Sequence, residues 1–137
     1  MKDVKGFSLI ELMVVVAILG ILVAMGNVAL TGYSQRAHRA DAHATLGDIA
    51  ARLERFVAQN NTYTTEISGA AGLGIGTTQS EEGYYTLAVA PCAGGNIAVC
   101  YVITATATGP QAADTDCAQI TLDSDGNRGG TTAGECW

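Results

Sequence analysis

The sequence predicts an α+β fold in which a long N-terminal helix packs on a small antiparallel sheet of about four strands. Three observations carry this prediction: an apolar run from Leu12 to Met25, apolar residues at helical spacing between Leu46 and Phe56, and short runs of period two after residue 83. The chain has 137 residues, which is enough for one such domain and too few for two ordinary ones.

The first half of the expected helix has the composition of a membrane-spanning segment. The run from Phe7 to Leu30 carries one charge, Glu11, and one asparagine, Asn27. A helix of about 20 residues spans the hydrocarbon core of a bilayer, so this run is long enough. Cleavage of a secretory signal peptide near Met25 is an alternative, but a carboxylate inside the apolar run argues against it. We therefore expect residues 7–30 to form a transmembrane helix.

The second half of the helix is expected to be amphipathic. Apolar side chains recur at positions i, i+3, i+7 and i+10 and form one stripe, Leu46, Ile49, Leu53 and Phe56. Asp48 and Arg52 are four residues apart on another face, where they can form an ion pair. No proline precedes Pro91, so one helix is expected from Phe7 to about Ala58.

Three later segments alternate apolar and polar residues, as half-buried antiparallel strands do. They are residues 84–90, 98–108 and 117–122, and a short fourth strand is expected near 128–132. In the second segment the alternation starts at Val99, which is expected to share a face with Tyr101 and Ile103. The apolar stripe of the helix is the available cover for this sheet.

The four cysteines, Cys92, Cys100, Cys117 and Cys136, all follow the apolar run. An even number of cysteines in a small exported domain indicates disulfides. A zinc site is disfavoured, because the sequence has no C-x-x-C pair and both histidines lie far away. Four cysteines allow three pairings.

The charge distribution argues against strong nucleic-acid binding. The formal net charge is −6, and after Arg55 a single arginine faces eight acidic residues. Such a surface repels phosphate backbones. The one basic cluster is on the expected helix and consists of Arg36, Arg39, Arg52 and Arg55.

A motif at the start of the apolar run identifies a family. Residues 6–12 read Gly-Phe-Ser-Leu-Ile-Glu-Leu, which closely resembles the type IV prepilin signal. The resemblance implies that residues 1–6 are a leader peptide, that an aspartyl prepilin peptidase cleaves between Gly6 and Phe7, and that the new Phe7 amine is methylated. It also implies a role for Glu11 in assembly.

Elementary chemistry supports these roles. Gly6 has no side chain, so a protease can close on the peptide there. Lys2 and Lys5 hold the leader on the cytoplasmic side by the positive-inside rule. A carboxylate within an apolar bundle needs a partner, and the nearest cation for Glu11 is the Phe7 amine of its own or a neighbouring chain. The alternative is a lone glutamate tolerated near the membrane interface.

The rest of the chain is similar to PilE-like minor pilins, in the helix around Tyr33 and Leu53 and in the C-terminal segment that ends in Cys-Trp. That segment looks like the D-region of pilins, a loop closed by a disulfide. The resemblance therefore favours Cys117–Cys136, and Cys92–Cys100 would then join adjacent strands. Many pilins carry proline where this chain has Val28.

We therefore expect a structural subunit of a type IV pilus, a minor pilin that assembles through its N-terminal helix. A DNA-uptake or adhesive binding pilin and a type II secretion pseudopilin are the alternatives. The expected partners are the bilayer before assembly, the prepilin peptidase, the inner-membrane assembly platform and other pilin subunits. Residues 31–137 would form the periplasmic globular domain, exposed at the cell surface once in a pilus.

Neither catalysis nor a cofactor is expected. The sequence offers no plausible nucleophile–base set, and the two histidines, His38 and His43, lie five residues apart on the expected helix. The segment that contains Asp123, Asp125 and Asn127 is a weak calcium candidate. An EF-hand would place Gly and Glu where this chain has Arg128 and Gly134, so a tight hairpin turn is favoured.

Overall fold

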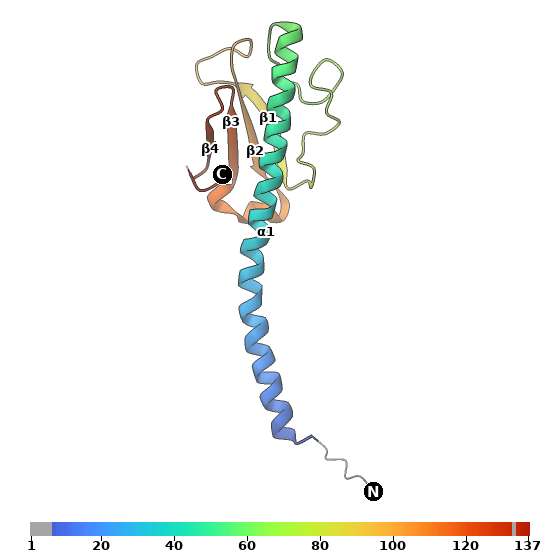
Figure 1. Ribbon diagram of the computed structural model, residues 1–137, viewed down its shortest axis with the longest axis vertical. Coiled ribbons are helices and arrows are strands. Elements are labelled where there is room, and N and C mark those ends of the chain that lie inside the picture. The colour runs from blue at the N-terminus through green and yellow to red at the C-terminus, as the bar shows by residue number, and fades with distance from the viewer. Residues whose placement is uncertain (1–6, 133) are drawn as a thin grey trace. The chain divides into compact units, whose positions relative to one another are not determined.

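The computed structural model describes residues 7–132 and 134–137 (Figure 1). The elements are helix α1 (Leu9–Asn60), strands β1 (Tyr85–Pro91), β2 (Tyr101–Ala107), β3 (Gln119–Asp123) and β4 (Arg128–Gly130), and the 3-10 helices η1 (Gly109–Ala113) and η2 (Thr115–Cys117). The predicted α+β class is confirmed, with one long helix and a four-stranded sheet. The expectations for the leader and for Gly6 lie outside the described residues.

The chain divides into two compact units, residues 1–34 and 35–137. Helix α1 contributes to both units. In the first unit the large apolar side chains from Phe7 to Val23 are all exposed, from 47% at Val15 to 81% at Phe7. These side chains form an exposed apolar surface on α1.

Within the described part of the chain, no helix combines the length and the apolarity that crossing a membrane requires. The transmembrane helix expected at residues 7–30 is therefore not confirmed and stays a prediction.

The sheet of the second unit is antiparallel throughout, in the order β1-β2-β3-β4. Its register pairs Leu87 with Ala105 and Ile103 with Leu122. Side chains alternate between the faces of a strand, and this places Tyr85, Leu87 and Ile103 on one buried face.

The core lies between that face and the C-terminal part of α1, which runs across the sheet in Figure 1. The helix contributes Leu46, Ile49 and Leu53, all fully buried, as the 3.6-residue periodicity predicts. Ala42 extends the stripe by one turn toward the N-terminus. Phe56 was expected in the stripe but is only partly buried, and it lies outside the core.

The prediction for Val99 is wrong. Strand β2 begins only at Tyr101, and Val99 is 76% exposed. The cause is the disulfide Cys92–Cys100, which closes a tight loop before the strand starts. Asn96 organises this loop, since its side chain accepts a hydrogen bond from the amide of Ala98 and its carbonyl accepts one from Val99.

Helix α1 ends at Asn60, two residues beyond the expected end near Ala58. Asn61 has a φ of 57°, in the left-handed region that Asn tolerates better than most residues. Its amide donates to the carbonyl of Val57, which closes the last turn. The chain then enters the loop of residues 61–84, whose Ile67 is buried in the core.

Candidate functional site

The first candidate site is the start of α1, where the prepilin motif places Phe7 and Glu11. Phe7 precedes the first helical residue, Leu9, and the carbonyl of Ser8 accepts hydrogen bonds from the amides of Glu11 and Leu12. Glu11 is exposed in the first turn of the helix, where the helix dipole favours a negative charge. The carboxylate is thus free to meet a cation outside its own unit.

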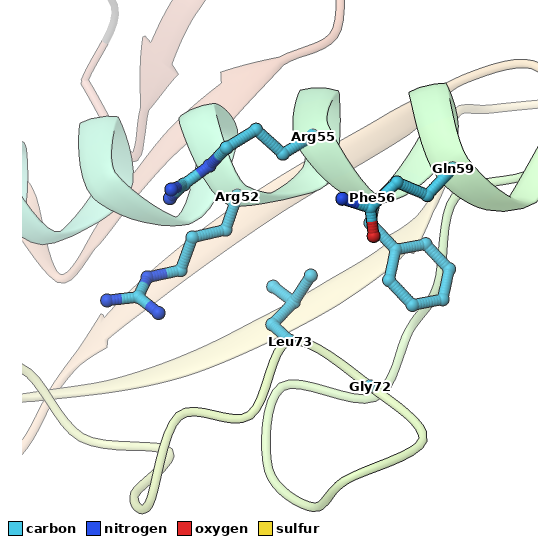
Figure 2. A pocket seen from close by; sticks show the side chains of 6 residues that line it. All are labelled: Arg52, Arg55, Phe56, Gln59, Gly72 and Leu73. Atoms are coloured by element: carbon cyan, nitrogen blue, oxygen red, sulfur yellow. The ribbon is translucent and has the colours of Figure 1, made fainter.

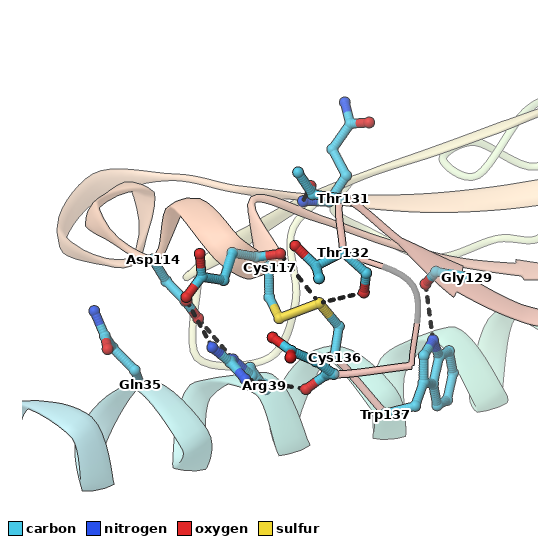
Figure 3. The surroundings of a disulfide bond; sticks show 12 residues. Gln35, Arg39, Asp114, Cys117, Gly129, Thr131, Thr132, Cys136 and Trp137 are labelled. Carbon is cyan, nitrogen blue, oxygen red and sulfur yellow. Dashed lines mark hydrogen bonds and ion pairs between the residues drawn. A yellow bond between two sulfur atoms is a disulfide. The ribbon is translucent and has the colours of Figure 1, made fainter.

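The second candidate site is the C-terminal loop (Figure 3). The structure pairs Cys117 with Cys136 and Cys92 with Cys100, the two pairs chosen from the sequence. Cys117 and Cys136 are both buried. A Cβ on Gly130 would collide with the backbone carbonyl of Gln119 and press on Cys136, so the loop depends on a glycine there.

The end of the chain is fastened to α1 by contacts that we call the C-terminal clamp, formed by His43, Arg128, Gly129, Cys136 and Trp137. His43 donates from Nε2 to the carbonyl of Cys136 at 2.6 Å, and its ring stacks on Trp137 with a centroid distance of 4.4 Å. The Trp137 indole donates to the carbonyl of Gly129, and the guanidinium of Arg128 lies 4.9 Å from the ring centroid. The clamp joins α1 to β4.

A second tie holds α1 to the segment between η1 and η2, through the ion pair of Arg39 and Asp114. Two hydrogen bonds of 2.7 Å join the groups in the bidentate arrangement that Arg and carboxylate favour (Figure 3). Asp114 is 4% exposed. The hydrogen bond to Asp114 raises the pKa of Arg39, which therefore stays charged.

Gln111 lies beside this pair and is 1% exposed. Its amide nitrogen donates to Asp114 and to the hydroxyl of Tyr85, and its oxygen accepts from Nδ1 of His38 at 2.8 Å. Burial raises the pKa of Tyr85. The network satisfies a buried amide at nearly every position, which fixes η1 against α1.

The sequence analysis missed both ties. Their partners are 73 to 96 residues apart and the contacts are polar, so no apolar periodicity marks them. The sequence carried one hint of them, a large aromatic residue, Trp137, directly after Cys136.

A shallow pocket lies between α1 and the loop that follows it (Figure 2). Its volume is about 260 Å³, and six residues line it, Arg52, Arg55, Phe56, Gln59, Gly72 and Leu73. Arg52 also forms the expected ion pair with Asp48, at 2.7 Å. Sequence analysis had grouped these arginines only as part of a basic helix.

The weak calcium candidate is a hairpin turn. One oxygen of Asp123 accepts the amides of Asp125 and Asn127, and the other accepts the side chain of Asn127. These hydrogen bonds lower the pKa of Asp123, that of the Asn127 side chain most. In the described residues, no group of three or more His, Cys, Asp or Glu side chains is placed to hold a metal ion.

Comparison with known proteins gives two family matches. The model described as "Type IV minor pilin ComP, DNA uptake sequence receptor" matches residues 29–121. The model described as "Prokaryotic N-terminal methylation motif" matches residues 1–26.

Two individual proteins are also similar. The chain is 36% identical over 78 residues to the type IV wide pilus major component PilA4 of Thermus thermophilus. The matched segment covers 57% of this chain and 60% of that protein. The chain thus spans less than two thirds of that relative. A solved type IV pilin from Shewanella oneidensis superposes with a TM-score of 0.53 at 26% identity, covering 75% of this chain and 97% of the pilin.

Proposed function

The chain belongs to the family of the type IV minor pilin ComP, whose model spans residues 29–121, and on this premise we propose how its N-terminal segment brings it into a pilus. The chain is a minor pilin, a structural subunit that assembles with other pilin subunits into a filament at the cell surface, and its precursor is membrane-anchored. Family membership favours this function over the type II secretion pseudopilin that the sequence left open.

The first proposed step is processing. The prepilin peptidase removes residues 1–6 by cleavage between Gly6 and Phe7, and the new amine of Phe7 is methylated. The methylation-motif match over residues 1–26 supports this step. So does the position of Phe7 before the helix, where it is 81% exposed and accessible to an enzyme.

The observation that carries the assembly step is the exposure of the apolar surface from Phe7 to Val23. A continuous apolar surface of this extent does not stay in water. We propose that residues 7–30 lie in the inner membrane before assembly, with residues 31–137 on the periplasmic side. The assembly platform then transfers the helix from lipid to a bundle formed with the helices of other subunits.

Glu11 is proposed to guide this transfer. Its carboxylate costs free energy in a bilayer or an apolar bundle unless a cation neutralises it. The methylated amine of Phe7 in a neighbouring subunit supplies that cation, and the pairing sets the axial position of each arriving helix.

The substitution Glu11→Ala tests this proposal, with Ser8→Ala as a control at the residue directly before α1. Immunoblots of sheared filaments and of the membrane fraction give the share of the subunit that is assembled. We expect Glu11→Ala to stay in the membrane fraction and Ser8→Ala to assemble as the wild type does. Equal assembly of wild type and Glu11→Ala would refute the role.

DNA uptake is the second candidate function, because the family description names a DNA uptake sequence receptor. The net charge of −6 opposes tight binding of a polyanion, so we expect at most weak and salt-sensitive binding. A gel-shift titration of the purified protein at physiological salt is the test. Tight, sequence-dependent binding would place the receptor function first.

A further inference from the structure

We propose that the pocket between α1 and the loop at residues 72–73 binds a carboxylate side chain of a neighbouring pilus subunit. This inference rests on the proposed assembly into a pilus and adds a second contact to it, in the globular unit. The pocket is lined entirely by residues of the second unit.

The shape of the pocket suits one acidic side chain. Figure 2 shows the guanidinium groups of Arg52 and Arg55 toward one end, the ring of Phe56 toward the other and Leu73 between them. The volume of about 260 Å³ lies below the usual range of about 300–1,000 Å³ for small-molecule sites. Two apolar side chains beside a pair of cations fit the methylenes and the carboxylate of a glutamate or an aspartate.

The wall of the pocket is held in place by close backbone packing. Gly72 lies against the carbonyl of Glu66 so tightly that a Cβ would collide with it. The amide of Leu73 donates to the same carbonyl at 3.0 Å. A preorganised wall loses little conformational entropy when a partner binds.

Arg55 is the cation best placed to bind a partner. Arg39 is committed to Asp114, and Arg128 lies over Trp137. Arg55 is exposed and lines the pocket, and its Nε donates to the carbonyl of Ala51 at 3.3 Å. Arg52 adds charge but shares it with Asp48.

A subunit carboxylate fits these groups better than nucleic acid does. The affinity of a protein for DNA comes largely from neutralising many phosphates, whereas this pocket offers two arginines. Pilin subunits are already held side by side by their helices, so a single carboxylate meets the pocket at high effective concentration. This chain itself exposes such groups, as at Glu81, Glu82 and Asp116.

The decisive test reverses the charge of Arg55. In whole cells, Arg55→Glu is expected to lower the assembled share of the subunit about tenfold, because like charges then face each other. Arg36→Glu is the matched control: the same charge change on an exposed arginine of the same helix, outside the pocket. Gln59→Glu should act as Arg55→Glu does while leaving both arginines intact. Unfolding midpoints of the purified variants check that each one folds.

A photo-crosslinking residue at position 59 identifies the occupant in the full-length protein within pili. The expected product is an adduct with a pilin subunit that Arg55→Glu abolishes. Assembly of Arg55→Glu at the level of Arg36→Glu, or an adduct with nucleic acid alone, would overturn the proposal. Absence of the wild-type chain from filaments would instead overturn the proposed function itself, and the pocket contact with it.

Discussion

His43 donates its Nε2 hydrogen to the backbone carbonyl of Cys136 across 2.6 Å, which ties α1 to the residue that closes the C-terminal disulfide. The same imidazole stacks on Trp137 at 4.4 Å. One side chain of the helix thus holds both the backbone and the aromatic ring of the last two residues. The contact joins two parts of the unit that are 93 residues apart in the sequence.

Loss of this side chain should weaken the globular unit. His43→Ala removes a hydrogen bond and a ring stack, and we expect the free energy of unfolding to fall by about 2 kcal/mol. Denaturant unfolding of the fragment 35–137, followed by circular dichroism and by the fluorescence of the single tryptophan, measures it. His43→Phe keeps the stack and should recover about half of the loss. A change of less than about 0.5 kcal/mol for His43→Ala would contradict the clamp.

Loss of the buried ion pair should lower the free energy of unfolding more than loss of His43 does. Arg39→Ala leaves the carboxylate of Asp114, which is 4% exposed, without its cation, and we expect a loss of about 3 kcal/mol. Arg36→Ala, an exposed arginine three residues earlier, should change stability by less than about 0.5 kcal/mol. The two unfolding curves should separate clearly. Coincident curves would show that water or another group replaces Arg39.

The two disulfides should contribute differently to the free energy of unfolding. The loop-entropy relation assigns about 3.2 kcal/mol to the bridge with a separation of 19 residues and about 2.5 kcal/mol to the one with a separation of 8. Cys117 and Cys136 are also buried and anchor the clamp. Replacing both by alanine should therefore destabilise the fragment more than the same change at Cys92 and Cys100. The reverse order in denaturant midpoints would contradict this ranking.

The turn at Asp123 predicts a specific acid response. Hydrogen bonds hold the folded-state pKa of Asp123 below its ordinary value of 3.8. Its stabilisation is therefore present above that ordinary value and is lost as the pH falls through the folded-state pKa. Between about pH 5 and about pH 2, wild-type stability should fall more than that of Asp123→Asn, which cannot ionise. Parallel curves for the two proteins would show that the turn does not depend on the charge.

Periodicity was sufficient to predict the fold class, the helix stripe at Leu46, Ile49 and Leu53, and the approximate strands, because burial of apolar faces leaves a regular pattern. It failed at Val99, where the alternation continues through a residue that the Cys92–Cys100 loop removes from the strand. It did not reveal the polar ties through His43 and Gln111, because a long-range hydrogen bond leaves no pattern in one sequence.

One candidate site could be predicted from the sequence, and the other could not. The prepilin motif placed Phe7 and Glu11 from a short, contiguous segment, and their roles stay predictions. The arginine pocket required the structure, since Gly72 and Leu73 reach Arg55 only through the path of the loop. Of the arginines that the sequence grouped on the helix, Arg52 and Arg55 line the pocket. Arg39 instead forms the ion pair with Asp114.

Mass spectrometry of the N-terminal peptide, taken from sheared filaments, tests the central claim most directly. A processed pilin that enters filaments should yield a peptide beginning at a methylated Phe7, with no peptide from residues 1–6. Filaments that lack the chain, or a chain that begins at Met1 or after Asn27, would contradict the account.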